Sequence, residues 1–77
     1  MITRAKFRLR NPTFGVTLKD GKMRPILIPK DSVIEVLDLQ QTQRMLNVDW
    51  EGVFVRLFAQ DIEERGELLQ YFTAANG

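Results

Sequence analysis

Apolar and polar residues alternate with a period of two along several segments of the chain, and this pattern constrains the fold more than any other feature. The alternation is clearest at residues 3–10, where Ala5, Phe7 and Leu9 are separated by basic residues. Successive side chains of a strand point to opposite faces of a sheet, so such a segment forms a strand with one buried face. We therefore expect a mainly β protein.

Two glycine-containing turns join further segments into hairpins. Gly21 follows an Asp near the middle of residues 14–28, and Gly52 follows a Glu near the middle of residues 44–58. Tight two-residue turns require positive φ angles, which glycine adopts without a steric penalty. The sequence therefore predicts two hairpins, and the apolar, β-branched and aromatic residues after Gly52 are typical of a central strand.

Prolines restrict where one hairpin arm can lie. Pro25 and Pro29 bracket three apolar residues, and proline has no N–H to donate to a neighbouring strand. We therefore expect this arm at the edge of a sheet or at a strongly bent corner. The alternation resumes at residues 33–37, which form a strand with Ile34 and Val36 directed inward.

The segments around and after the second hairpin are less regular. Residues 38–43 form a polar connection without apolar periodicity. Asp61 is suited to cap the start of a short helix near residues 59–65, and Gly66 is suited to end it in a left-handed conformation. Residues 67–72 fit either a continued helix or a closing strand, and we favour the strand.

The second hairpin supplies the predicted core. Trp50, Phe54 and Phe58 could line a ligand groove, but aromatic residues in so small a domain more often fill its interior. We therefore assign this aromatic cluster to the core. The side chains predicted to form the centre of the core are Leu46, Val48, Trp50, Val55 and Leu57.

The length and the residue types absent from the chain limit its organisation. A chain of 77 residues accommodates one small domain, which we place at residues 1–72, with a frayed tail at residues 73–77. The chain has no cysteine, so disulfides are excluded and a reducing cytoplasm is the expected location. The N-terminal segment is rich in cations where a signal peptide needs apolar residues, and no segment is long and apolar enough for a membrane helix.

Histidine is also absent. Without His and Cys, the common ligand sets for zinc, iron and copper cannot be assembled, so we expect no metal and no cofactor. Neither a nucleophile–base pair nor a phosphate-binding glycine loop can be named. We therefore expect the protein not to be an enzyme.

A resemblance adds to these expectations. Residues 28–37 (IPKDSVIEVL), 48–52 (VDWEG) and 58–67 (FAQDIEERGE) resemble short bacterial proteins of uncharacterised function. The order of strands, hairpins and helical turn resembles SH3-like small barrels, which implies a closed five-stranded barrel. The aromatic and acidic groove pattern of peptide-binding SH3 domains is not found on the loops, and the resemblance implies no known activity or site.

Charge is unevenly distributed along the chain. Residues 1–30 contain eight Lys or Arg and one acid, whereas residues 31–77 contain three Arg and nine acids. Such asymmetry is a hint of an anionic partner, although the two halves can also neutralise one another across strand pairs. The candidate site for an anion or nucleic acid is the stripe of four cations on the first strand, namely Arg4, Lys6, Arg8 and Arg10.

The stripe has two interpretations. Cations two residues apart on a strand are separated by about 7 Å, a spacing that suits a row of backbone phosphates. A solvated face on an edge strand, with Lys and Arg opposing edge-to-edge pairing, explains the same pattern, and we favour it. A second charged run, which could attract a cation or a basic partner but also suits the start of a helix, consists of Asp61, Glu63, Glu64 and Glu67.

These observations favour a binding module over an enzyme. A protein partner or a second copy of the chain is the leading expectation, because neither catalytic groups nor a complete nucleic-acid-binding pattern is present. The alternative is a small nucleic-acid-binding barrel that uses the basic N-terminal strand. No membrane and no metal are expected among its partners.

Overall fold

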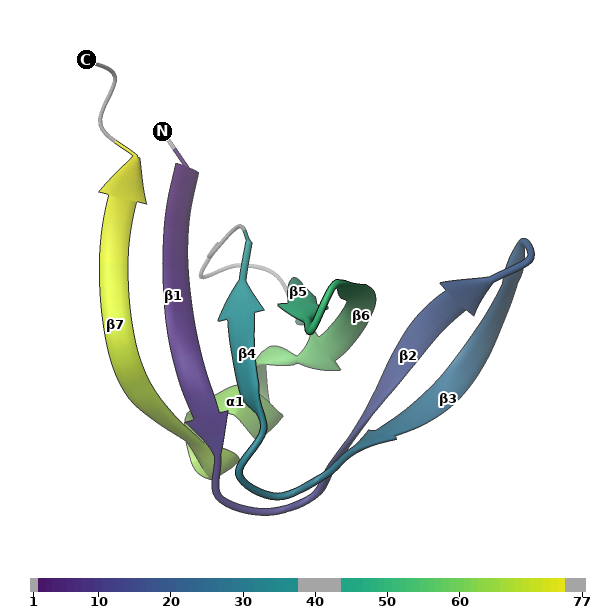
Figure 1. The fold of residues 1–77 in the computed structure, drawn as a ribbon, viewed down its shortest axis with the longest axis horizontal. Helices are drawn as coiled ribbons and strands as arrows, with labels where there is room; N and C mark the ends of the chain where they lie inside the picture. The colour runs from purple at the N-terminus through teal and green to yellow at the C-terminus, as the bar shows by residue number, and fades with distance from the viewer. Residues whose placement is uncertain (1, 38–43, 75–77) are drawn as a thin grey trace.

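The computed structural model describes residues 2–37 and 44–74, and the described chain is mainly β. The polar connection expected at residues 38–43 lies outside the described residues. The order of elements agrees with the sequence prediction of a strand, a hairpin, a strand, a second hairpin, a helical turn and a last strand (Figure 1). The elements are β1 (Ile2–Leu9), β2 (Thr13–Lys19), β3 (Lys22–Ile28), β4 (Val33–Val36), β5 (Met45–Trp50), β6 (Val53–Phe58), α1 (Ala59–Arg65) and β7 (Gly66–Ala74).

The strands form one open antiparallel sheet in the order β3-β2-β6-β5-β4-β1-β7. The expectation of a closed five-stranded barrel is therefore wrong. The β2–β3 hairpin joins the sheet because β2 pairs with β6, which raises the number of strands to seven. Its other strand, β3, becomes one edge of the sheet, and β7 becomes the opposite edge. Figure 1 shows the hairpin and the β1–β7 pair diverging from a common base on opposite sides of the molecule.

Both predicted hairpins are confirmed. Lys19 pairs with Lys22 across the first turn, and Trp50 pairs with Val53 across the second. Both residues of each two-residue turn have positive φ angles, including 74° at Gly21 and 83° at Gly52. The placement of the proline-containing arm at an edge is also confirmed, because β3 stands at the end of the strand order, beside β2.

A third glycine, Gly15, allows the first hairpin to pack closely against the sheet. A Cβ atom placed on Gly15 would lie 2.5 Å from Cδ2 of Leu57 and 2.9 Å from the carbonyl oxygen of Arg56. Beside this position, Val16 pairs with Arg56 and Thr17 pairs with Val55. The close approach of β2 to β6 thus requires a residue without a side chain.

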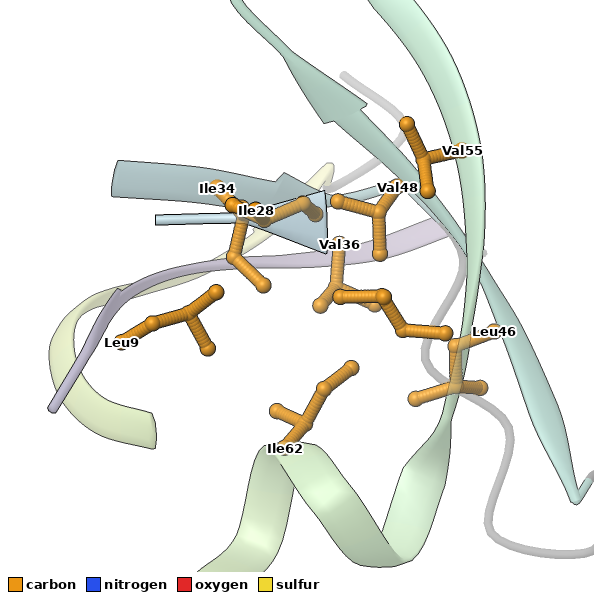
Figure 2. Close-up of a cluster of buried hydrophobic side chains, with 9 residues drawn as sticks. Leu9, Ile28, Ile34, Val36, Leu46, Val48, Val55 and Ile62 are labelled. Atoms are coloured by element: carbon orange, nitrogen blue, oxygen red, sulfur yellow. The ribbon is translucent and has the colours of Figure 1, made fainter. Parts of the chain in front are cut away.

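The core lies between the inward face of the sheet and α1. Figure 2 shows Ile62 of α1 directed towards the side chains of the strands. Four of the five predicted core residues are buried, whereas Trp50 is only partly buried and packs against the cluster. The buried cluster consists of Leu9, Ile28, Ile34, Val36, Leu46, Val48, Val55, Leu57 and Ile62.

The predicted aromatic cluster does not form. Phe54 and Phe58 are each 51% exposed. Phe54 pairs with Asp49, whereas Trp50 pairs with Val53, so Trp50 and Phe54 lie on opposite faces of the sheet. Their spacing of four residues was misleading, because the two-residue turn places residues three apart, Trp50 and Val53, on the same face and so reverses the parity of the faces between the two arms.

The short helix lies where it was predicted, but its ends differ. Phe58 is the N-cap residue and makes no side-chain capping bond, so the N-cap assignment of Asp61 is wrong. Gly66 is extended, with φ −96°, because the chain passes directly into β7. Within the described residues, no helix is long and apolar enough to cross a membrane.

The preferred strand assignment for residues 67–72 is confirmed, because β7 includes this whole segment. The strand continues to Ala74, which pairs with Ile2 of β1, and residues 75–77 lie outside the described part of the chain. The register between β1 and β7 shifts once, so Leu69 is an extra residue opposite the Lys6–Phe7 step. This β-bulge interrupts the edge of the sheet.

Candidate interaction surface

The outward face of the sheet, opposite the core, divides into two halves of different chemistry. In the half formed by β4, β1 and β7, which we call the charged half, cations alternate with the buried Ala5 and Leu9. In the half formed by β3, β2 and β6, which we call the hairpin half, the outward positions are mainly apolar. Strand β5 joins the two halves.

The cations of the first strand lie beside acids on both neighbouring strands. Arg4 Nη1 is 3.5 Å from Oε2 of Glu35 on β4. Arg8 Nη1 is 3.5 Å from Oε1 of Glu67 on β7. The expected neutralisation across strand pairs therefore occurs at two positions, although these partially exposed pairs each contribute little stability.

The remaining two cations of the stripe are placed differently. Lys6 is partly buried and lies across from Glu35 on β4 and Gln70 on β7. Arg10 follows the end of β1, and its Nη2 donates to the carbonyl oxygen of Gly66 over 3.4 Å. The four cations thus do not form one uniform row.

The acidic run gives no metal site. Within the described residues, no group of three or more carboxylates could hold a metal ion. Asp61 lies in the first turn of α1, and Glu64 accepts a hydrogen bond of 3.1 Å from Nε2 of Gln60. Glu67 belongs to β7 and lies by Arg8, so the four acids of the run are divided between two elements.

The main candidate surface is the outward side of the hairpin half. Six large apolar side chains there are between 49% and 66% exposed. Cross-strand pairing brings them together on one face, because outward positions of paired antiparallel strands lie opposite each other. We call this set the apolar face, and it consists of Phe14, Leu18, Met23, Leu27, Phe54 and Phe58.

The register of the strands sets the layout of the apolar face. Phe14 pairs with Leu27, and Leu18 pairs with Met23. A surface hollow of about 260 Å³ lies where β2, β3 and β6 meet, and it is lined by Leu18, Met23, Phe54 and Arg56. The apolar face is therefore continuous across the three strands and contains a depression that a partner side chain could enter.

The charged groups near the apolar face are few and balanced. Arg56 lies on the outward side of β6, and its Nε donates to Oδ1 of Asn47 over 3.4 Å. Asp49, two residues further along β5, shares this side and pairs with Phe54. Lys19, Lys22 and Arg24 fall on the other side of the hairpin, because they alternate with the residues of the apolar face.

Backbone hydrogen bonds fix the base of the hairpin. Ser32 accepts from the N–H of Leu9, and Asp31 donates its N–H to the carbonyl oxygen of Leu9. Arg65 of α1 donates from Nη1 to the carbonyl oxygen of Pro12 over 3.1 Å. The connections on both sides of the hairpin are thus tied to β1 and α1, which holds the apolar face in a defined position.

Sequence reasoning missed the apolar face. In β2 the large apolar residues all lie on one side, so alternation predicts burial of Phe14 and Leu18, whereas the structure exposes them and buries Thr13 and Gly15 of the opposite side. A signal was present in β6, where Phe54 and Phe58 have the same parity as Arg56 and the opposite parity from Val55 and Leu57. This parity would have assigned the two phenylalanines to the outward face.

Comparison of this chain with protein-family models, with curated proteins and with solved structures finds no match. The assignment of function therefore rests on the chemistry of the two outward surfaces.

Proposed function

We propose that this chain is a non-enzymatic interaction module that binds a protein partner or a second copy of itself through the apolar face. The observation that carries the proposal is the set of six half-exposed apolar side chains on one sheet surface. Contiguous apolar surface of this kind on a small protein typically marks an interaction site. The hollow lined by Leu18, Met23, Phe54 and Arg56 offers a place for an anchoring side chain.

A nucleic-acid partner for the basic strand is the alternative function. Arg4 and Arg8 each lie 3.5 Å from a carboxylate oxygen, which reduces the positive charge available to phosphates. Single-stranded nucleic acid is usually bound by aromatic side chains along a cationic groove. The exposed phenylalanines of the apolar face lie on β2 and β6, away from the stripe on β1, and this separation favours the protein partner.

The resemblance to short bacterial proteins with an SH3-like fold remains a proposal. It is supported by the order of elements along the chain and by the position of β1 between β4 and β7. The open sheet departs from the closed barrel that the resemblance implies. The proposed cytoplasmic location likewise rests on composition, chiefly the absence of cysteine.

Site-specific photocrosslinking tests the proposed function. Phe54 is replaced by photoreactive benzoylphenylalanine in the full chain, which is then irradiated in the cells that produce it. The matched control carries the same group in place of Tyr71, an aromatic residue of β7 that is 57% exposed. We expect a protein adduct from position 54 and none from position 71. A nucleic-acid adduct at position 54, or equal adducts at both positions, would contradict the proposal.

A further inference from the structure

The chain exposes more surface than a compact monomer of its mass. The chain exposes 5518 Å², whereas a compact monomer of 8.9 kDa is expected to expose about 4,800 Å². A protein–protein interface of standard size covers roughly 800 Å² on each partner. The exposed apolar face of the hairpin half is the part of the surface where we place such an interface.

The edges of the sheet are poorly suited to self-association. Pro25 lies in the middle of β3 and pairs with Val16. Lys19 and Lys22 form the hydrogen-bonded pair that closes the turn, and hydrogen-bonded and non-hydrogen-bonded pairs alternate along an antiparallel hairpin. The pair of Pro25 with Val16 is therefore a non-hydrogen-bonded pair, so the nitrogen of Pro25 points towards the free edge of the sheet, where it has no N–H to donate. At the other edge, the bulge at Leu69 interrupts β7. Both features oppose edge-to-edge pairing, so packing of face against face is the remaining route.

The charges around the apolar face are self-complementary. Among the outward positions of β2, β3, β5 and β6, the charged residues are Arg56 and Asp49, one of each sign. Two identical faces related by a two-fold axis can bring each Arg56 to Asp49 of the other copy. A strongly basic face would repel its own copy and favour an anionic partner instead.

We propose that the apolar face is the interface of a two-fold symmetric dimer of this chain. This inference rests on the proposed function and names a second copy of the chain as the partner. The two sheets pack face to face, with the apolar side chains between them and Arg56 of each copy against Asp49 of the other. This isologous arrangement closes on itself, so association stops at two copies. It also covers the apolar side chains that the open sheet leaves in water.

Sedimentation of the full chain between about 10 µM and 1 mM, a range that detects dissociation constants of ordinary weak dimers, tests the proposal. We expect the mass to rise from the 8.9 kDa of one chain towards twice that value. Phe54→Glu and Leu18→Glu, on two different strands, should each weaken association at least about tenfold by burying an unpaired charge. The control is Leu68→Glu, a residue of β7 that is 56% exposed, and it should leave association unchanged.

A charge-exchange experiment tests the arrangement within the dimer. Arg56→Asp and Asp49→Arg each place like charges across the interface, so each variant alone should associate at least about tenfold more weakly. Mixed in equal amounts, the two variants should form a heterodimer in which both contacts join opposite charges. Only a contact between chains can be restored by mixing, so a mixture that stays monomeric would overturn this interface.

The two proposals fail in different ways. A chain that keeps the mass of one copy up to about 1 mM overturns the dimer, as does a control that disrupts association as strongly as Phe54→Glu. If the photocrosslinker at position 54 then captures a different protein, the proposed function stands without the dimer. If it captures nothing, both proposals fail. Capture of a second copy supports both.

Discussion

The two halves of the outward face are built from the same antiparallel pairing, but one exposes charged side chains to water and the other exposes apolar side chains. In the charged half, Arg4 and Arg8 meet carboxylates on the neighbouring strands. In the hairpin half, Phe14 and Leu18 occupy the equivalent outward positions and are 66% and 63% exposed. The charged half therefore presents paired charged groups to water, whereas the hairpin half exposes apolar surface that association could remove from water.

This difference separates the requirements of folding from those of binding. The inward faces of both halves contribute to one buried cluster, which includes Ile34 of the charged half and Leu57 of the hairpin half. The fold therefore has one core under both halves, and the apolar face is additional to it. The large side chains of the apolar face are not part of this core, and exposed apolar side chains of this kind are typical of interaction surfaces.

The largest expected effect compares the two faces of β6. Leu57→Ala removes a fully buried side chain and should lower the free energy of unfolding by about 2–5 kcal/mol. Phe54→Ala, on the outward face and 51% exposed, should cost about 1 kcal/mol or less in a dilute sample. Urea unfolding measures both values. Equal costs would mean that the apolar face belongs to the core, and the contrast between the halves would fail.

The next effect concerns the junction that attaches the hairpin half. Gly15→Ala places a methyl group against Leu57 and the backbone of Arg56, so it should destabilise the protein by about 1–3 kcal/mol. Amide exchange should accelerate in β2 and β3 more than in β1 and β7. Gly21→Ala is the control, because its Cβ meets nothing within 4 Å and only its φ of +74° is unfavourable. Uniform acceleration over the sheet would show that the hairpin is not a separately attached unit.

The smallest effect concerns the charged half. Arg4→Glu and Arg8→Glu should each lower the free energy of unfolding by about 0.2–1 kcal/mol. Arg4→Glu should have the larger effect, because the Glu35 side chain is 23% exposed and the Glu67 side chain 50%.

Added salt should shrink both differences by screening the charges. Arg24→Glu is the control, since no ion pair involves Arg24 within residues 2–37 and 44–74. Titration with labelled oligonucleotides at about 50 mM salt, where phosphate contacts are strongest, should show no binding by the unmodified chain. Binding that Arg4→Glu abolishes would instead favour the nucleic-acid alternative.

Several parts of the fold were predictable because their causes are local. Alternation at residues 3–10 placed Ala5 and Leu9 in the core, and the turns at Gly21 and Gly52 lie where their backbone freedom indicated. The edge position of β3 followed from its prolines. Each of these properties depends on one residue or on a few neighbours in sequence.

The helix ends and the aromatic cluster could not be predicted in this way. Gly66 is extended because β7 pairs with β1 immediately after α1. In the charged half, Glu35 and Glu67 form ion pairs with Arg4 and Arg8 from strands that are distant in sequence. These outcomes depend on which strands become neighbours, a property that local patterns do not specify.

By itself, the sequence determined that the chain is mainly β, where its hairpins turn and which positions alternate. Only the tertiary structure decided that the sheet is open and that one side of the β2–β3 hairpin is exposed. The physical reason is that local alternation in β2 favours burial of Phe14 and Leu18, whereas the pairing of the strands buries the opposite side, which carries Thr13 and Gly15. The choice follows from the pairing of β2 with β6 at Val16 and Thr17, which turns Phe14 and Leu18 away from the core.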